Sequence, residues 1–189
     1  PGCHAMVARR DPVEPGATWI DVGGRSSGLD SEDEMIERTG NILDSGAAAL
    51  VNPVNCVGIS GAGLAKAVAL RYPRWAAAYK AAAKRGEIRI GHVWRHAADI
   101  AIDAPLIYAL PTKRHWREPS RLEDVAAGLE ALAVDVCHSE FPPTSLALPA
   151  VGCGLGSLPW GQVRPLIEAA AERMERAGVT VFLYPPGAL

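Results

Sequence analysis

The sequence of 189 residues has no long apolar run, no excess of basic charge and no clustered cysteines. No stretch approaches the roughly 18 consecutive apolar residues that a membrane-spanning helix needs, so we expect no membrane association. The 19 Lys and Arg residues are matched by 21 Asp and Glu residues, which gives a net charge of −2. A protein that holds nucleic acid mainly through its phosphates would show a basic excess, so this mode of binding is disfavoured.

The four cysteines, Cys3, Cys56, Cys137 and Cys153, are scattered along the chain. They form no Cys-x-x-Cys pair and no Cys/His pair at ligand spacing, so we expect neither a metal site nor a disulfide framework. The sequence also has no secretory signal pattern of a charged region, an apolar region and a cleavage site. We therefore expect a reduced, cytoplasmic protein that needs no cofactor.

Hydrophobic residues make up 49% of the chain, and 19 glycines and 15 prolines interrupt it. This composition excludes intrinsic disorder, which combines low hydrophobicity with high net charge. We expect residues 35–189 to form one domain, of a size that buries about 70% of its unfolded surface. Residues 1–34 are predicted to be an N-terminal extension, in which only Thr18–Val22 has the pattern of a short strand. Residues 1–5 precede Met6 and are expected to be an expression remnant.

From residue 35 onward, strand-like and helix-like segments alternate. Strands are predicted over Met35–Thr39, Ala48–Val54, Ile88–Arg95, Leu106–Leu110, Ser145–Ala150 and Val179–Tyr184. Helices are predicted over Leu64–Arg71, Arg74–Arg85, Ser120–His138 and Gln162–Ala177. Ser120 and Glu123 have the spacing of a capping box, and Pro165 requires that its helix begin about one turn earlier. Apolar strands alternating with helices predict an α/β fold whose mostly parallel sheet is covered on both faces.

The first glycine-rich segment, Asn52–Gly63, lies between a predicted strand and a predicted helix. Its glycines allow backbone N–H groups to approach an anionic ligand, and the N-terminus of the following helix favours the charge of that ligand. The segment is not a Walker A loop, because Leu64 stands where that motif has lysine. A dinucleotide-binding site would place an acidic residue about 20 positions further on, where this chain has Lys84 and Arg85. An ordinary strand-to-helix turn remains the alternative.

The second glycine-rich segment, Pro149–Ser157, also follows a predicted buried strand and precedes a predicted helix. The carboxyl ends of parallel strands lie at one edge of a sheet, where ligands bind. Two glycine-rich loops at that edge can hold a diphosphate and a sugar from opposite sides. Each loop alone could be a turn, but the pair favours a phosphate-containing ligand.

A basic segment, Pro111–Arg117, follows a third predicted strand. A solvated basic loop is the simplest interpretation, but cations beside two anion-binding loops favour a role in the site. We expect Lys113 to be crowded by Arg114 and partly desolvated. Both effects lower the pKa of a lysine amine, which is how a lysine becomes a nucleophile or a base.

Three segments, in this order, resemble the macrodomain family of ADP-ribose-binding modules over Met35–Tyr184. They are Gly40-Asn41-Ile42, similar to the family's Gly-Asp-Ile; Val51–Asn55, similar to its Val-Asn-x-x-Asn; and Leu148–Gly154, similar to its diphosphate loop. The resemblance implies a three-layer α/β/α fold with a mixed, mostly parallel central sheet. It also implies that the ligand is ADP-ribose.

Within the family, Pro111–Trp116 and Ser120–Glu123 are most similar to the lysine-dependent branch, which includes terminal ADP-ribose glycohydrolase and the macrodomains of DarG antitoxins. Lys113 falls at the catalytic position of this branch. The resemblance implies that the ligand-binding residues are Asn41, Ile42, Asn52, Asn55, Gly58, Ser60, Gly61, Ala62, Gly63, Gly152, Cys153, Gly154, Leu155, Gly156 and Tyr184. Asn41 and Tyr184 would lie at the adenine, Gly58–Gly63 with Asn55 at the distal ribose, and Gly152–Gly156 at the diphosphate.

The branch has an aspartate just after Gly-Cys-Gly-Leu that assists the lysine, and this chain has Gly156 there. A simpler scheme is therefore predicted, in which Lys113 acts at the distal ribose as a nucleophile or as an electrostatic stabiliser. The predicted activity is hydrolysis of ADP-ribose from modified macromolecules. The alternatives are a non-catalytic reader of ADP-ribose and, disfavoured by Lys84 and Arg85, a nucleotide-cofactor oxidoreductase.

The macromolecule that carries the ADP-ribose is left open by the sequence. It is either a protein with ester-linked acidic side chains or DNA with modified nucleobases, and we expect the chain to act as a monomer. Arg114, Trp116 and Arg117 could contact DNA through charge and stacking, or they could equally form a solvated rim.

Overall fold

A computed structural model describes residues 35–99 and 104–187. The predicted N-terminal extension, with its expected strand over Thr18–Val22, lies outside the described residues. The strands are β1 (Ile36–Glu37), β2 (Ala49–Asn55), β3 (Trp94–Ala97), β4 (Leu106–Lys113), β5 (Ser145–Pro149) and β6 (Thr180–Tyr184). The helices are the 3₁₀ helix η1 (Ile42–Asp44) and the α-helices α1 (Gly63–Arg71), α2 (Pro73–Lys84), α3 (Leu122–Cys137) and α4 (Trp160–Arg176).

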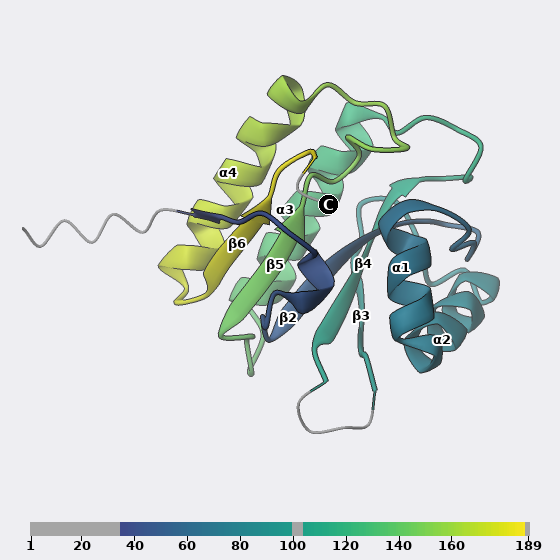
Figure 1. Ribbon diagram of the computed structural model, residues 1–189, viewed down its shortest axis with the longest axis horizontal. Coiled ribbons are helices and arrows are strands. Elements are labelled where there is room, and N and C mark those ends of the chain that lie inside the picture. The colour runs from purple at the N-terminus through teal and green to yellow at the C-terminus, as the bar shows by residue number, and fades with distance from the viewer. Residues whose placement is uncertain (1–34, 100–103, 188–189) are drawn as a thin grey trace, which may run out of the picture. The chain divides into compact units, whose positions relative to one another are not determined.

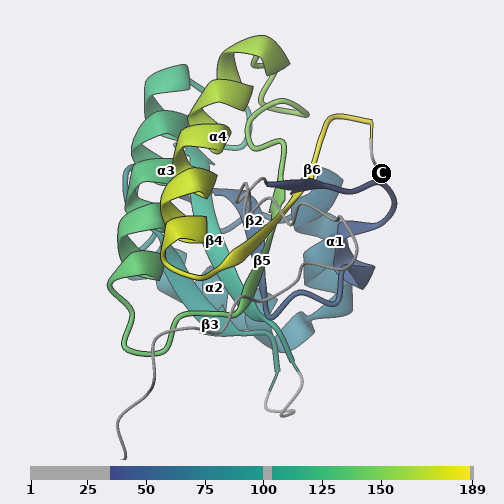
Figure 2. The same cartoon turned by 90° about the vertical axis from the view of Figure 1, so that its left-hand side faces the viewer.

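The strands form one six-stranded sheet in the order β1-β6-β5-β2-β4-β3. β3 is antiparallel to β4, and all other neighbours are parallel, so the predicted mixed, mostly parallel sheet is confirmed. Helices α3 and α4 pack on one face of the sheet, and α1 and α2 pack on the other, as Figure 1 and Figure 2 show. The described residues therefore have the predicted three-layer α/β/α arrangement.

Strand β2 shows why the sheet is covered on both faces. Ala49 and Val51 belong to the core under α3 and α4, whereas Leu50 and Val54 belong to the core under α1 and α2. Successive side chains of a strand point to opposite faces, so a continuous apolar run needs a cover on each side. The strand ends at Asn55, directly before the first glycine-rich loop.

The predicted bounds of β4 and of the strand before it need correction. A strand over Ile88–Arg95 is wrong, because the chain turns at Gly91, with a φ of +74°, and pairs only from Trp94 onward. β4 continues past its predicted end at Leu110 and reaches Lys113. Lys113 is therefore the last residue of a strand and does not lie in a loop.

A proline stands near this extended end of β4. Strand β3 pairs with β4 only as far as Ala109, so the remainder of β4 has β2 as its partner and an open edge on the other side. Proline is tolerated at such an edge, where a missing N–H breaks no ladder. Pro111 is accordingly paired in register with Val54 of β2.

The capping box predicted at Ser120 and Glu123 is wrong. α3 begins at Leu122 with Arg121 at its N-cap, and no side chain caps it. The Ser120 N–H instead donates to the Gly156 carbonyl at 3.0 Å, and the Ser120 hydroxyl is buried with no hydrogen-bond partner in the described part of the chain. Ser120, which the local pattern predicts to cap α3, is thus hydrogen-bonded to the second glycine-rich loop.

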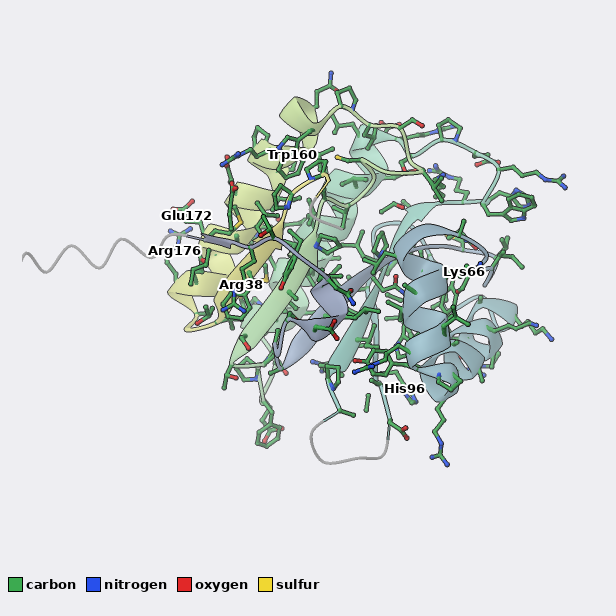
Figure 3. The ribbon with its side chains drawn as sticks, viewed as in Figure 1. Arg38, Lys66, His96, Trp160, Glu172 and Arg176 are labelled. Atoms are coloured by element: carbon green, nitrogen blue, oxygen red, sulfur yellow. The ribbon has the colours of Figure 1, made fainter. Side chains whose placement is uncertain are left out.

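Helix α4 contains Pro165, as the sequence predicted. The helix begins at Trp160, slightly more than one turn ahead of the proline, so the ring removes a single hydrogen bond in the second turn. Trp160 packs against the core under α3 and α4, and Figure 3 shows it at the start of α4.

Candidate active site

A cavity of about 1200 Å³ opens at the carboxyl ends of four strands. The last residues of β2, β4, β5 and β6 all line it; they are Asn55, Lys113, Pro149 and Tyr184. In open α/β sheets, ligands bind in the crevice at this end of the strands. The volume suits a large organic ligand rather than a single ion.

Most of the predicted site residues line this cavity. They are Ile42, Asn55, Gly61, Ala62, Gly63, Lys113, Gly152, Cys153, Gly154, Leu155, Gly156 and Tyr184. Both glycine-rich loops and the predicted catalytic lysine are therefore brought to one place. The contacts of each residue with a ligand stay predictions.

Four predicted site residues do not line the cavity: Asn41, Asn52, Gly58 and Ser60. The Asn41 side chain caps η1, with its oxygen accepting from Leu43 N–H at 3.1 Å. Asn52 is fully buried within β2. Gly58 turns with a φ of +77° against α2, where an added Cβ would lie 2.9 Å from Ala83 Cβ. Any ligand contact of these four residues stays a prediction.

The first loop is folded onto the side chain of Asn55. The Asn55 amide nitrogen donates to Ile59 O at 2.7 Å, and its oxygen accepts from the N–H groups of Val57 and Ile59, both at 3.2 Å. The Tyr79 hydroxyl donates to Asn55 O at 2.6 Å, and burial raises the pKa of Tyr79, which keeps the hydroxyl protonated. Asn55 therefore holds the loop in shape and lines the cavity at the same time.

The start of α1 also faces the cavity. Gly61, Ala62, Gly63 and Leu64 all line it, and no side chain caps the helix at Ala62. The first N–H groups of a helix have no partner within the helix and attract anions. This end of the cavity is therefore suited to a phosphate or to sugar hydroxyls.

The second loop is built from tight backbone turns. Cys153 N–H donates to Ala150 O at 3.1 Å, Ser157 N–H to Gly154 O at 3.0 Å, and Leu158 N–H to Gly152 O at 3.1 Å. Gly156 is buried at the point where these turns meet the Ser120 backbone. The loop residues that line the cavity include Gly152, Gly154 and Gly156, which place no side chain between their backbone and a ligand.

Lys113 connects the two sides of the cavity. Its amine donates a short hydrogen bond to Leu155 O of the second loop, and its carbonyl accepts from Cys56 N–H of the first at 3.0 Å. Burial lowers the pKa of the Lys113 amine. The predicted direction of this shift is thus confirmed, and a partly desolvated amine at the strand end is suited to nucleophilic or electrostatic roles.

The predicted crowding of Lys113 by Arg114 is wrong. Arg114 turns to Asp124 in the first turn of α3 and binds both carboxylate oxygens, one of them at 3.0 Å. Asp124 is only 4% exposed. Since the carboxylate neutralises the guanidinium, burial alone is left to lower the pKa of Lys113.

Sequence reasoning missed the carboxylates of this region. Glu118 is the one acidic residue among the described residues that line the cavity. It directly follows the basic segment Pro111–Arg117, so extending that segment by one residue would have found it. Asp124 was hidden, because an acid in the first turn of a helix is usual without any tertiary partner.

Other candidates have no role in the cavity. His92, His96 and His138 are exposed and do not line it; Figure 3 shows His96 on β3. Burial raises the pKa of the Cys56 and Cys153 thiols, which disfavours reactive thiolates. Within residues 35–99 and 104–187, no three potential metal ligands gather, and no helix has the length and apolarity to span a membrane.

Several known proteins are similar to this chain in sequence and in fold. The "DNA ADP-ribosyl glycohydrolase" of Thermus aquaticus is 40% identical over 148 residues, which are 78% of this chain and 40% of that protein. The macrodomain of Mycobacterium tuberculosis DarG has a TM-score of 0.76 and 36% identity, over 82% of this chain and 99% of that one. DarTG of Thermosipho africanus, solved in complex with ADP-ribose, has a TM-score of 0.72 and 29% identity, over 79% of this chain and 41% of that one.

The chain spans about 40% of the length of the curated relatives that it matches. The sequence model of the Macro domain matches residues 51–167, which include both glycine-rich loops and Lys113. With the α/β/α layers and the cavity at the strand ends, this match establishes the family. The chain belongs to the macro domain family.

Proposed function

We propose that the chain releases ADP-ribose from modified DNA bases by hydrolysis at the distal ribose. The observation that carries this proposal is the partly buried Lys113 amine, which lies between two glycine-rich loops in one cavity and has a lowered pKa. Relatives named for action on ADP-ribosylated DNA support the choice of DNA over protein. A related protein solved in complex with ADP-ribose supports the ligand.

The shape of the cavity suggests how ADP-ribose is held. The backbone of Gly152–Gly156 would hold the diphosphate, and the N-terminus of α1 would favour its charge. Ile42 of η1 and Tyr184 at the end of β6, which both line the cavity, would pack against the adenine. The distal ribose would then lie beside Asn55, Gly61 and Lys113.

The reaction replaces one bond at C1″ of the distal ribose. The bond from C1″ to the base nitrogen breaks, the base leaves with a proton, and the oxygen of water bonds to C1″. As a nucleophile, the neutral Lys113 amine bonds to C1″ as the bond to the base breaks; water then bonds to C1″ as the bond to Nζ breaks, which restores the amine. As a stabiliser, Lys113 stays charged beside the leaving base, and water bonds to C1″ directly. Its lowered pKa increases the neutral fraction and so favours the nucleophile.

A parallel release assay tests this proposal. Purified protein is given thymidine-linked or guanine-linked ADP-ribose in DNA and, separately, glutamate-linked ADP-ribose in a peptide. We expect release from DNA, and we expect Lys113→Ala to abolish it without changing the affinity for free ADP-ribose by more than a few-fold. No release from any substrate, or release unaffected by Lys113→Ala, refutes the proposal.

A non-catalytic reader is the second candidate. Gly156 favours a reader, because the lysine-dependent branch that this chain resembles has at this position an aspartate that assists the lysine. Calorimetry that shows ADP-ribose binding without any turnover would establish the reader.

The remaining expectations concern setting and assembly. Bacterial relatives named for action on DNA support ADP-ribosylated DNA as the partner and the cytoplasm as the location. A monomer remains the expected assembly. Sedimentation of the purified protein tests the monomer.

A further inference from the structure

An exposed tryptophan stands at the mouth of the cavity. Trp116 lines the cavity together with Lys113, and 46% of its surface is exposed. Tyr184, the other aromatic residue of the described lining, is buried. Tryptophan is enriched at binding interfaces, because its large ring is apolar while its N–H can stay in water.

A short turn connects Trp116 to the lysine. β4 ends at Lys113, and the chain then folds back so that Glu118 N–H donates to His115 O at 3.1 Å. Trp116 lies inside this turn, directly after the strand end. Lys113 and Trp116 both line the cavity, and the proposed function puts C1″, with the group attached to it, at Lys113.

Arg117 supports one face of the tryptophan. Its guanidinium carbon lies 4.6 Å from the centre of the Trp116 ring, in a cation–π contact. Arg117 makes no ion pair within the described ranges, whereas Arg114 is neutralised by Asp124. The positive charge at Trp116 is therefore available to an anion such as a backbone phosphate.

We propose that Trp116, backed by Arg117, is a stacking platform for the nucleobase that carries the ADP-ribose. This inference rests on the proposed function, and it makes Trp116 a specificity-determining residue. A base has a flat π-face that stacks on tryptophan, and its flanking phosphate meets the arginine. An ester-linked glutamate side chain has no such face, so stacking on Trp116 adds little to its affinity.

The platform also restricts the form of the DNA. Inside a duplex, both faces of a base are covered by its neighbours, so the base must be unstacked before it can lie on Trp116. A single strand meets this requirement at little cost. The favoured substrate is therefore an unpaired, modified base, with little dependence on the flanking sequence.

The test compares Trp116→Leu, which keeps apolar bulk but removes the π-face, with Trp116→Phe, which keeps a smaller π-face. Phe141→Leu is the matched control, because Phe141 is an exposed aromatic residue, 81% exposed, that does not line the cavity. Each variant is measured for kcat/KM on a modified single strand, the same strand in duplex, and a modified peptide. Each is also combined with Lys113→Ala to measure Kd for the modified single strand and for free ADP-ribose.

We expect Trp116→Leu to weaken binding and turnover of the modified single strand by about 5- to 150-fold, the range that loss of one stacked base produces. The fold-loss for the modified single strand should be at least five times the fold-change in kcat/KM for the peptide and in Kd for free ADP-ribose. Trp116→Phe should recover most of it, and Phe141→Leu should change nothing. The duplex should be the poorer substrate for wild-type protein.

Equal losses with DNA, peptide and free ADP-ribose would overturn the inference, as would no loss at all or equal use of duplex and single strand. The affinities keep this result separate from that of the proposed function. If the wild-type protein releases nothing, yet the Lys113→Ala protein binds the modified strand through Trp116, the hydrolase proposal fails and the platform stands.

Discussion

Substitution of Gly156 tests how the second loop is built. Gly156 is the position at which the resembling branch carries an aspartate, so Gly156→Asp is the natural attempt to restore that acid. The structure leaves no space for it. A Cβ on residue 156 would lie 2.8 Å from the carbonyl carbon of Gly152, and closer still to the Gly152 oxygen and the Ser120 hydroxyl. Backbone atoms, unlike the end of a flexible side chain, cannot turn aside.

The expected cost follows from what must move. Gly156 O accepts from Ser120 N–H at 3.0 Å, and Gly152 O accepts from Leu158 N–H at 3.1 Å. Moving these backbones apart breaks both hydrogen bonds, each worth about 1 kcal/mol, and leaves overpacking strain of about 1–3 kcal/mol. We expect Gly156→Ala to lower the free energy of unfolding by about 3–5 kcal/mol, and Gly156→Asp by more, because its carboxylate is buried as well.

Urea unfolding of the purified protein measures this change, and a fall in Tm of roughly 6 °C or more accompanies it. Gly154→Ala is the matched control in the same loop, since Gly154 is exposed and an added Cβ meets no atom within 4 Å. It should stay within about 1 kcal/mol of the wild-type protein. If Gly156→Ala is as stable as Gly154→Ala, the crowding at residue 156 is not real and the reasoning fails.

Two further predictions concern Lys113. Burial disfavours the ammonium and lowers the pKa of Lys113. If the amine is a nucleophile, kcat/KM should rise with pH and reach its plateau below the ordinary pKa of lysine. A kcat/KM that falls as pH rises indicates the stabiliser. Lys113→Arg, whose cation does not deprotonate, then abolishes a nucleophilic reaction but preserves a stabilised one. Asp124→Asn leaves the Arg114 guanidinium without its carboxylate partner. A bare positive charge at the next residue disfavours the Lys113 ammonium, so the rising limb should move to lower pH. A profile of Asp124→Asn that superimposes on the wild-type one contradicts this neutralising role of Asp124.

Much of the architecture follows from signals that act over a few residues. α2 begins at Pro73 and ends just before Gly86, which has a φ of +72°, as start and stop signals for helices require. The apolar run at β2 predicted a strand buried on both faces. The alternation of such elements then predicted the sheet, and the order of the two glycine-rich loops placed both at the same edge.

The local signals misled where a distant segment competes for the same residue. Ser120 has the spacing of a capping residue, yet its N–H is bonded to the second loop and its hydroxyl caps nothing. Arg114 was expected beside Lys113, yet it is drawn to Asp124, ten positions away. A capping motif or a run of charges describes what a residue can do, and the stronger tertiary partner decides what it does.

The sequence by itself determined the alternation of elements, the backbone freedom of the two loops and the presence of Lys113 directly after a strand. These properties depend on neighbours along the chain, which set helix and strand periods and the allowed values of φ. Only the tertiary structure decided that Lys113 contacts Leu155, 42 positions away, and that Gly156 has no space for a side chain. Such contacts depend on how strands and helices pack, and neither periodicity nor composition records the distance between two segments that meet only when the sheet is complete.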